Sequence, residues 1–273
     1  MSTGLIGVFD SGLGGLVIMK ELDKQFPEYS FLYLGDNARA PYGTKTPDEV
    51  YRFTLEAVEY LFGQGCELLI LACNTASANA LHRIQQEVLP AKYPTKRVLG
   101  ILVPTVEQVH GGTIGIFATP GTVKSEAYVH EIMKRQPTAE VFQVACPTLV
   151  EMIEAGEGDE RVFGEVEKYV GELKATMGER FPPENVLLGC THFPLVHHLF
   201  VRALPSTVHV YDQATMVAAS LKDYLLRHLE MEQKIGRDGT RTFATTGDAR
   251  EVEKKASAFY GKPVSFESVK ITL

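Results

Sequence analysis

Short apolar runs alternate with segments of helical spacing along most of this chain, and that alternation limits the fold more than any other feature. Each run is almost continuously apolar, as are strands that are buried on both faces of a parallel sheet. Repeated strand–helix units of this kind predict an α/β fold with mainly parallel sheets. The predicted strands are Leu5–Phe9, Phe31–Leu34, Leu68–Ala72, Val98–Leu102, Thr113–Phe117, Val141–Val144, Val186–Leu188 and Val208–Tyr211.

The segments between these runs carry apolar residues at helical spacing. Thr46 precedes Pro47, which is typical of an N-cap followed by the first helical position. The chain after Gly236 gives a loop and only a weak signal for a last strand. The predicted helices are Thr46–Phe62, Val123–Arg135, Leu149–Ala155, Arg161–Met177, Met216–Glu232 and Ala249–Tyr260.

A faint internal repeat predicts two similar lobes. The sequence IGVF at residues 6–9 returns as IGIF at residues 114–117, and LILACNT at residues 69–75 returns as VLLGCTH at residues 186–192. The two motif pairs occur in the same order. We therefore expect two pseudo-symmetric α/β lobes whose strand ends face one cleft, with an active site in that cleft.

Composition excludes several classes of protein. The 273 residues are 45% hydrophobic and 22% charged, which is typical of a folded globular protein. Lys and Arg total 27 against 34 Asp and Glu, and the resulting formal charge of −7 argues against a general nucleic-acid partner. A small anionic substrate remains compatible, because backbone amides bind anions.

The N-terminus has no signal-peptide pattern, and the apolar runs are far shorter than the roughly 20 residues of a membrane-spanning helix. We therefore expect a cytoplasmic protein with no membrane partner. Its cysteines are then expected to be reduced.

Two of the four cysteines stand out. Cys73 and Cys190 each follow a predicted strand at equivalent places in the repeat, at a predicted helix start, where the helix dipole and free amides favour a thiolate. Cys66 and Cys146 fit small buried hydrophobic residues. No two cysteines have the CxxC spacing, so no metal site is expected.

Two facing thiols fit three chemistries. They could form a redox disulfide, or act as a covalent nucleophile and its partner. They could also transfer protons to opposite faces of one carbon, which would invert a stereocentre. The residues alone leave these alternatives open.

Other polar residues follow the predicted strands. The glycine-rich turn after Asp10 lacks the last glycine of a dinucleotide motif and the lysine of a P-loop, so it suits a small anion better than a nucleotide. His192 is close enough to Cys190 in sequence to tune that thiol. The residues alone do not separate Glu154 from Glu151 or Glu157 as a further acid.

Four ordered motifs resemble those of the bacterial glutamate racemases, in the aspartate/glutamate racemase family. They are GVFDSGLGG at residues 7–15, YLGDNARAPYG at 33–43, ACNTAS at 72–77 and GCTHFPL at 189–195. The resemblance implies an isomerase that interconverts L- and D-glutamate without a cofactor and supplies D-glutamate for peptidoglycan and cell wall synthesis. It also implies a homodimer.

The resemblance implies roles for individual residues as well. Cys73 would act on the D-glutamate face and Cys190 on the L-glutamate face, supported by Asp10, His192 and Glu154. The C-terminal segment would return to the first lobe, which gives residues 1–97 and 208–273 as one lobe and residues 98–207 as the other. The implied substrate-binding residues are Asp10, Ser11, Pro41, Tyr42, Gly43, Asn74, Thr75, Thr119, Thr191 and His192.

Three rival functions remain. In aspartate racemases the second cysteine motif tends to read Cys-Thr-Glu, whereas here it reads Cys190-Thr191-His192, which favours glutamate. A non-catalytic carboxylate-binding protein on the same scaffold would be favoured by loss of a cysteine, and both are present. A redox dithiol protein is the third alternative.

Overall fold

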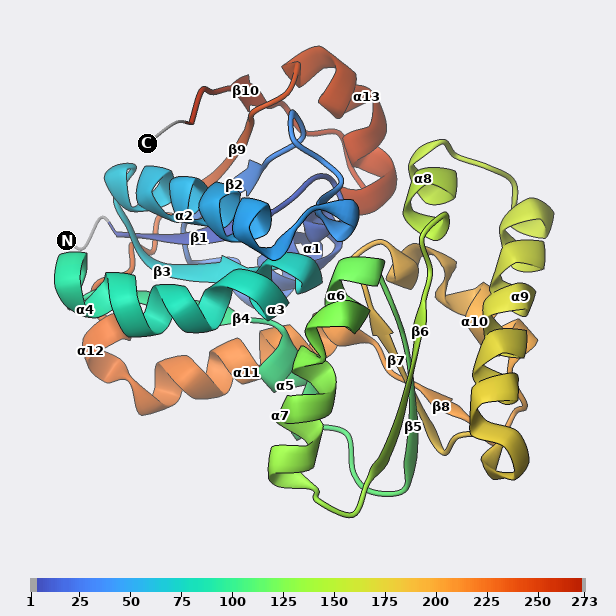
Figure 1. The fold of residues 1–273 in the computed structure, drawn as a ribbon. Helices are drawn as coiled ribbons and strands as arrows, with labels where there is room; N and C mark the ends of the chain where they lie inside the picture. The colour runs from blue at the N-terminus through green and yellow to red at the C-terminus, as the bar shows by residue number, and fades with distance from the viewer. Residues whose placement is uncertain (1–3, 272–273) are drawn as a thin grey trace.

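The computed structural model describes residues 4–271, and in that part every strand pair belongs to one of two parallel sheets (Figure 1). The larger sheet has the strand order β10-β9-β2-β1-β3-β4, and the smaller has the order β6-β5-β7-β8. The predicted α/β class with parallel sheets is confirmed. The strands are β1 Leu5–Asp10, β2 Phe31–Gly35, β3 Cys66–Leu71, β4 Arg97–Gly100, β5 Thr113–Ala118, β6 Glu140–Ala145, β7 Asn185–Gly189, β8 His209–Val210, β9 Arg241–Thr245 and β10 Glu267–Ser268.

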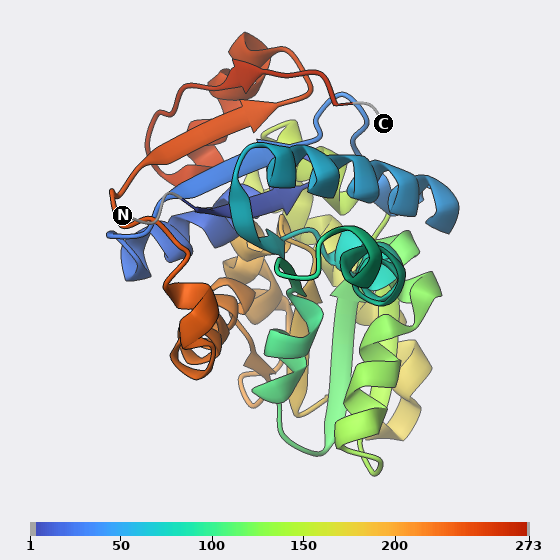
Figure 2. The same ribbon diagram turned by 90° about the vertical axis from the view of Figure 1, so that its left-hand side faces the viewer.

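Helices cover both faces of the larger sheet (Figures 1 and 2). Alternate residues of β1 point to opposite faces, so Val8 joins the core under α1, α11 and α13 while Phe9 joins the core under α2 and α3. The helices around this sheet are α1 Gly15–Gln25, α2 Pro47–Gly63, α3 Asn74–Arg83, α4 Leu89–Lys92, α11 Gln213–Arg227, α12 Leu229–Glu232 and α13 Ala249–Tyr260. Two short turns accompany them, η1 Tyr42–Thr44 and the π-helical η2 Ile84–Val88.

The smaller sheet is packed in the same way. Ile116 lies in the core that includes α5 and α7, whereas Phe117 lies in the core that includes α9 and α10. The helices around this sheet are α5 Leu102–Glu107, α6 Pro120–Ser125, α7 Ala127–Arg135, α8 Leu149–Glu154, α9 Asp159–Met177 and α10 His197–Ala203. The 3₁₀ turns η3 Gly178–Arg180 and η4 Phe193–Val196 complete it.

The sequence repeat corresponds to equivalent strands. β1 lies between β2 and β3 in the first sheet, and β5 lies between β6 and β7 in the second. Cys73 follows β3 and Cys190 follows β7. Each cysteine thus comes directly after the strand that pairs with β1 in the first sheet or with the equivalent strand β5 in the second. The C-terminal strands β9 and β10 extend the first sheet, and α13 packs on it (Figure 2).

Strand pairing moves both boundaries that were expected between the lobes. Arg97–Gly100 pairs with β3 and so belongs to the first sheet, although residues from 98 onward were expected in the second lobe. His209–Val210 pairs with β7 and belongs to the second sheet, although residues from 208 onward were expected in the first. The chain therefore passes from the first lobe to the second after β4, at α5. It returns to the first lobe after β8, at the start of α11.

Several predicted elements have different limits. The run Val98–Leu102 is a strand only as far as Gly100, because Leu102 begins α5. The helix expected over Val123–Arg135 is divided at Glu126, whose positive φ of 54° ends α6. The helix expected over Met216–Glu232 begins earlier, at Gln213, and is interrupted at His228.

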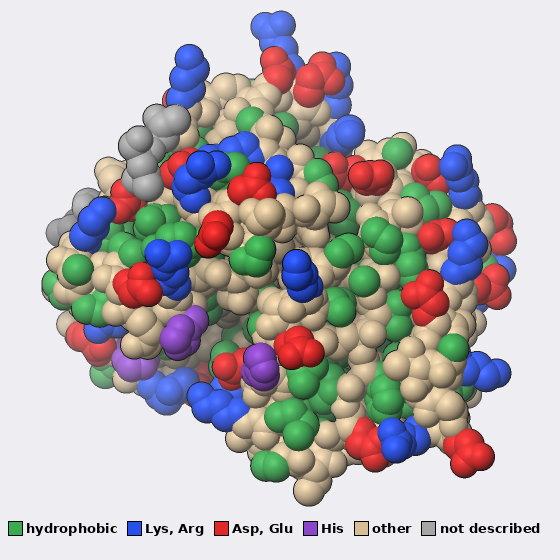
Figure 3. Space-filling model, in the orientation of Figure 1, with side chains coloured by type: hydrophobic (Ala, Val, Ile, Leu, Met, Phe, Trp, Pro, Cys, Tyr) green, Lys and Arg blue, Asp and Glu red, His purple; other side chains and the backbone are tan. Residues whose placement is uncertain are grey.

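The surface carries charges of both signs, as the similar numbers of basic and acidic residues in the sequence predict. On the face shown in Figure 3, acidic and basic side chains are interspersed. Among residues 4–271, no helix combines the length and the apolarity that crossing a bilayer requires.

Thr46 caps α2 as predicted. Its hydroxyl accepts a hydrogen bond from the backbone N–H of Glu49 at 3.3 Å, and the Glu49 carboxylate accepts from the backbone N–H of Thr46 at 2.9 Å. This reciprocal arrangement satisfies two backbone donors that a helix start otherwise leaves free.

We expect Thr46→Ala to lower the free energy of unfolding by about 1 kcal/mol, because the substitution removes the acceptor for the Glu49 amide. Urea denaturation followed by circular dichroism measures the change. Thr46→Ser keeps the acceptor and should stay close to the wild type. Equal losses in the two variants would contradict the capping role.

Candidate active site

The two sheets bring their carboxyl edges to one cavity. Register pairs Phe9 with Leu71 in the first sheet and Ala118 with Gly189 in the second, so the chain segments that follow these strands leave each sheet at a common edge. The residues that line the cavity between them are Ser11, Gly12, Ala40, Pro41, Gly43, Cys73, Asn74, Thr75, Thr119, Val150, Glu154, Cys190, Thr191 and His192.

Every predicted site residue except Asp10 and Tyr42 lines this cavity. Asp10 lies buried beneath it, where its carboxylate accepts from the Gly12 amide at 2.8 Å and from the Thr191 hydroxyl at 3.3 Å. The second of these bonds joins the two lobes. Burial raises the pKa of Asp10, although His192 and the hydrogen bonds oppose that rise.

The side chain of Tyr42 is directed away from the cavity. Its hydroxyl donates to the buried carboxylate of Asp36, and its ring packs beside Phe9 and Phe53 with centroids 6.2 and 5.9 Å away. Tyr42 therefore anchors the turn from which Pro41 and Gly43 reach the cavity. Asp36 was not predicted, although it belongs to one of the motifs.

Cys73 is enclosed and has two close polar neighbours. It is the N-cap of α3, where its sulfur accepts from the Ala76 amide at 3.4 Å, and it lies 3.3 Å from the Ser11 hydroxyl. Burial and then the charge of Asp10 nevertheless raise the pKa of Cys73 to about 12. The helix start is as predicted, but its amides do not make this thiol a thiolate at neutral pH, because burial outweighs them.

Cys190 has different neighbours. Its sulfur lies 3.8 Å from His192 Nδ1, and His192 Nε2 lies 2.8 Å from a carboxylate oxygen of Glu154. Among the three candidate acids it is thus Glu154 that reaches the histidine. The turn after Cys190 leads into η4 rather than into an α-helix, so the predicted helix start is wrong here.

The three groups form a chain of complementary charges. Burial alone would lower the pKa of His192, but its contacts with Cys190 and Glu154 outweigh burial and raise that pKa to about 10. Burial would raise the pKa of Glu154, but the hydrogen bond from His192 lowers it. At neutral pH an imidazolium therefore lies between the carboxylate and the Cys190 sulfur.

A threonine cluster joins the lobes on the other side of the cavity. The hydroxyl of Thr75 on α3 lies 2.9 Å from that of Thr119 and 3.3 Å from that of Thr122 on α6. Thr119 and Thr122 are 3.1 Å apart. Thr122 was not predicted, although it lies only three residues after Thr119.

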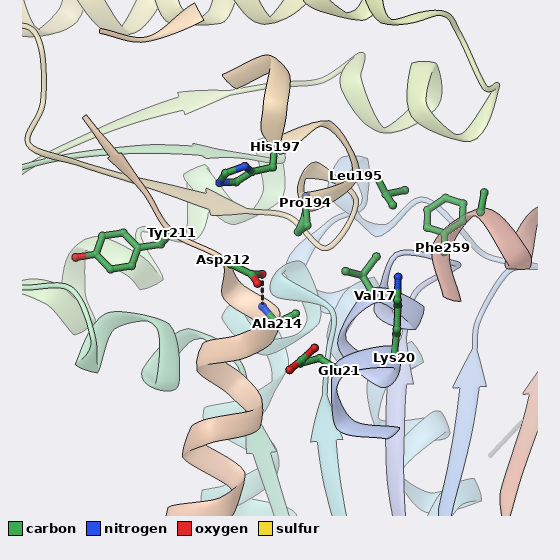
Figure 4. Close-up of a pocket in the computed structure, with 11 residues that line it drawn as sticks. Val17, Lys20, Glu21, Pro194, Leu195, His197, Tyr211, Asp212, Ala214 and Phe259 are labelled. Atoms are coloured by element: carbon green, nitrogen blue, oxygen red, sulfur yellow. Dashed lines mark hydrogen bonds between the residues drawn. The ribbon is translucent and has the colours of Figure 1, made fainter. Parts of the chain in front are cut away.

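A second hollow lies nearby but contains neither thiol (Figure 4). Lys20, Tyr211 and Phe259 are among its lining residues, and Phe259 also meets the His192 ring edge-on at 5.5 Å. The Asp212 carboxylate in this hollow is occupied, since it accepts from the Ala214 amide at 3.1 Å and caps α11. The cavity with both thiols is therefore the candidate active site.

The part of the chain between residues 4 and 271 has no group of three or more His, Cys, Asp or Glu side chains placed to hold a metal ion. All four cysteines are buried and free.

Comparison with known proteins gives consistent results. A family model described as Asp/Glu/Hydantoin racemase matches residues 6–221. A protein of Cereibacter sphaeroides named glutamate racemase is 42% identical over 280 residues, which cover 96% of this chain and 99% of that protein.

Solved structures agree over almost the whole chain. A glutamate racemase from Bacillus anthracis matches with a TM-score of 0.87 and 30% identity, covering 99% of this chain and 98% of the other. A glutamate racemase from Francisella tularensis, solved in complex with D-glutamate, matches with a TM-score of 0.87, 29% identity and the same coverage.

The histidine–carboxylate contact predicts a pH-dependent contribution to stability. The folded pKa of His192, about 10, lies above its ordinary value of 6.5, so this contribution is complete below pH 6.5 and is lost as the pH rises through about 10. Glu154→Gln removes the negative charge. Its melting temperature should therefore fall furthest below that of the wild type near pH 6, with a difference that shrinks toward pH 10.

Thermal unfolding at several pH values measures this difference. Glu151→Gln, an exposed substitution on the same helix, is the matched control and should show no such trend. A constant difference between the wild type and Glu154→Gln across the range would contradict the prediction.

Proposed function

The chain belongs to the Asp/Glu/hydantoin racemase family, and on that premise we propose that it is a glutamate racemase in which Cys73 and Cys190 exchange protons with Cα. One observation carries the proposal: two thiols, each at the end of a parallel strand in a different sheet, line one cavity. A planar carbanion held between them can be protonated on either face. Inversion then requires only that Cα become planar, and the rest of the substrate can stay in place.

The protonation states support one direction of transfer from the resting protein. The imidazolium of His192 lies 3.8 Å from the Cys190 sulfur, where its charge attracts negative charge, while burial keeps the proton on Cys73. The Cys190 thiolate removes the Cα proton of L-glutamate. The Cys73 thiol then gives its proton to the opposite face, so that D-glutamate forms, Cys190 ends as a thiol and Cys73 as a thiolate.

The reaction is difficult because the Cα proton is very weakly acidic. The negative charge that develops toward the substrate carboxylate needs donors that are already in place. Asn74 and Thr75 offer the free backbone amides at the N-terminus of α3, and both residues line the cavity. Exclusion of water strengthens each of these interactions.

The proposal extends to the role of the product. We infer that D-glutamate made by this protein supplies peptidoglycan synthesis in the cytoplasm. We also infer that the protein works as a homodimer, which sedimentation velocity at micromolar concentration would test.

Deuterium exchange tests the activity directly. The purified protein, with no cofactor added, should exchange and invert Cα of both L- and D-glutamate in deuterated buffer, and should leave L-aspartate unchanged. Nuclear magnetic resonance and optical rotation follow the two processes. If neither glutamate exchanged or inverted at Cα, the proposal would be overturned. Turnover of aspartate alone would indicate an aspartate racemase.

Single thiol variants test the assignment of faces. Cys73→Ala should lose inversion by at least about a thousandfold. It should also lose Cα exchange on D-glutamate while Cys190 still exchanges L-glutamate. Cys190→Ala should show the reverse pattern. Cys66→Ala, at a buried thiol outside the cavity, is the control and should keep both exchanges.

Gly14 tests the contact between the lobes. Its φ of −58° suits any residue, but a Cβ at this place would collide with the Thr191 hydroxyl and lie 2.5 Å from His192 Nδ1. We expect Gly14→Ala to lower kcat/KM by about 100-fold, because it displaces groups that must be placed within about 1 Å. Gly171→Ala on α9 meets no atom within 4 Å and should leave kcat/KM unchanged, so equal activity of the two variants would contradict this role.

A further inference from the structure

A buried cluster of four polar side chains lies behind the cavity and was not predicted from the sequence. Its members are Asn74, Thr105, Tyr128 and Gln213, each at most 2% exposed. They come from α3, α5, α7 and α11, which belong to both lobes and to the segments that cross between them. Asn74 also lines the cavity beside Cys73.

The hydrogen bonds of this cluster can be traced in one direction from Thr105. The Thr105 hydroxyl donates to the carbonyl of Ile101 at 2.7 Å, so it can only accept from Gln213. The nitrogen of the Gln213 amide must therefore face Thr105, at 2.9 Å. Its oxygen then faces Asn74 and accepts from Asn74 Nδ2 at 2.8 Å.

Tyr128 holds the other end of the Asn74 amide. Its hydroxyl accepts from the Gln213 nitrogen at 2.8 Å and donates to Asn74 Oδ1 at 2.6 Å. Gln213 Nε2 also lies 3.1 Å from Asn74 Oδ1. The Asn74 amide is thus oriented from both sides, with its nitrogen bound to Gln213 and its oxygen to Tyr128.

This orientation leaves one hydrogen of Asn74 Nδ2 for the cavity. An amide nitrogen carries two hydrogens, and within residues 4–271 Gln213 is the acceptor of one of them while the other has no acceptor. A buried donor without a partner is costly, and a negatively charged acceptor satisfies it best.

We propose that Gln213 is a positioning residue that fixes the Asn74 amide so that its second Nδ2 hydrogen donates to a carboxylate of bound glutamate. With the amide reversed, Asn74 Oδ1 would face that carboxylate and repel it. The identity of the ligand rests on the proposed function. The orientation of the amide rests on the hydrogen bonds alone.

The substitution Thr105→Val tests this inference because it keeps the shape of the side chain and removes the acceptor that holds the Gln213 nitrogen in place. The Gln213 amide can then rotate and present its nitrogen to Asn74. We expect KM for both enantiomers to rise about tenfold or more while kcat changes less than about twofold, since the lost bond is to a group that does not react.

Two matched variants separate positioning from general damage. Thr105→Ser keeps the hydroxyl and should restore a wild-type KM. Thr54→Val makes the same chemical change at a buried threonine on α2 whose hydroxyl has no hydrogen-bond partner among residues 4–271, and should leave KM unchanged. If Thr105→Val does not fold, Tyr128→Phe removes the donor to Asn74 Oδ1 and should raise KM in the same way.

A wild-type KM in a folded Thr105→Val or Tyr128→Phe variant would overturn the proposal, as would a rise in Thr105→Ser equal to that in Thr105→Val. A spectroscopic measurement keeps the result independent of the enzyme activity. The ¹⁵N side-chain signals of Asn74 and Gln213, identified by their loss in Asn74→Ala and Gln213→Met, should shift between the wild type and Thr105→Val, because the groups that accept from each nitrogen change. If the wild type is inactive on glutamate, the proposed function fails while this measurement still decides the orientation. Unchanged signals in Thr105→Val would refute it.

Discussion

The site depends on the contact between two loops that leave different sheets with almost no space between them. Asp10 follows β1 and accepts from the Thr191 hydroxyl, and Gly14 lies so near to Thr191 and His192 that a single methyl group would not fit. Without this contact each thiol would lie at the edge of its own sheet. The close approach converts two strand ends into one enclosed cavity, and enclosure in turn determines the proton affinities of the groups inside it.

Equivalent positions in the two lobes have acquired different electrostatic surroundings. Cys73 shares its side of the cavity with the buried carboxylate of Asp10, which opposes a second negative charge. Cys190 faces an imidazole that its contacts with Cys190 and Glu154 keep protonated. Similar strand geometry therefore gives a thiol on one side and a sulfur beside a cation on the other, and this difference suits the proposed roles of the pair as acid and base at one pH.

Much of this arrangement follows from the sequence, because parallel strands place whatever follows them at one edge. The runs that end at Phe9, Ala72 and Leu188 were enough to bring Asp10, Cys73 and Cys190 together. β9 has no comparable run, since it begins with the half-buried Arg241 and the exposed Thr242, and only a weak strand signal resulted.

The Gln213 cluster had no local signal at all. Its four members are far apart in sequence, and nothing near Gln213 marks it as more than a residue before a helix. The proton affinity of Cys73 was misjudged for a related reason. A helix start can be read from neighbouring residues, whereas burial depends on every segment that covers the sulfur.

The unequal surroundings of the two thiols do not give the reaction a preferred direction. L- and D-glutamate have the same free energy in an achiral solvent, so the equilibrium constant is one, and the two values of kcat/KM measure the same barrier from free enzyme and free substrate. They must be equal for any arrangement of side chains. In a resting protein with a protonated Cys73, kcat and KM can therefore each differ between L- and D-glutamate. The ratio kcat/KM must still be the same for both. Conversion of L-glutamate beyond a one-to-one mixture then requires a second reaction that removes D-glutamate, and the site itself affects only the rate.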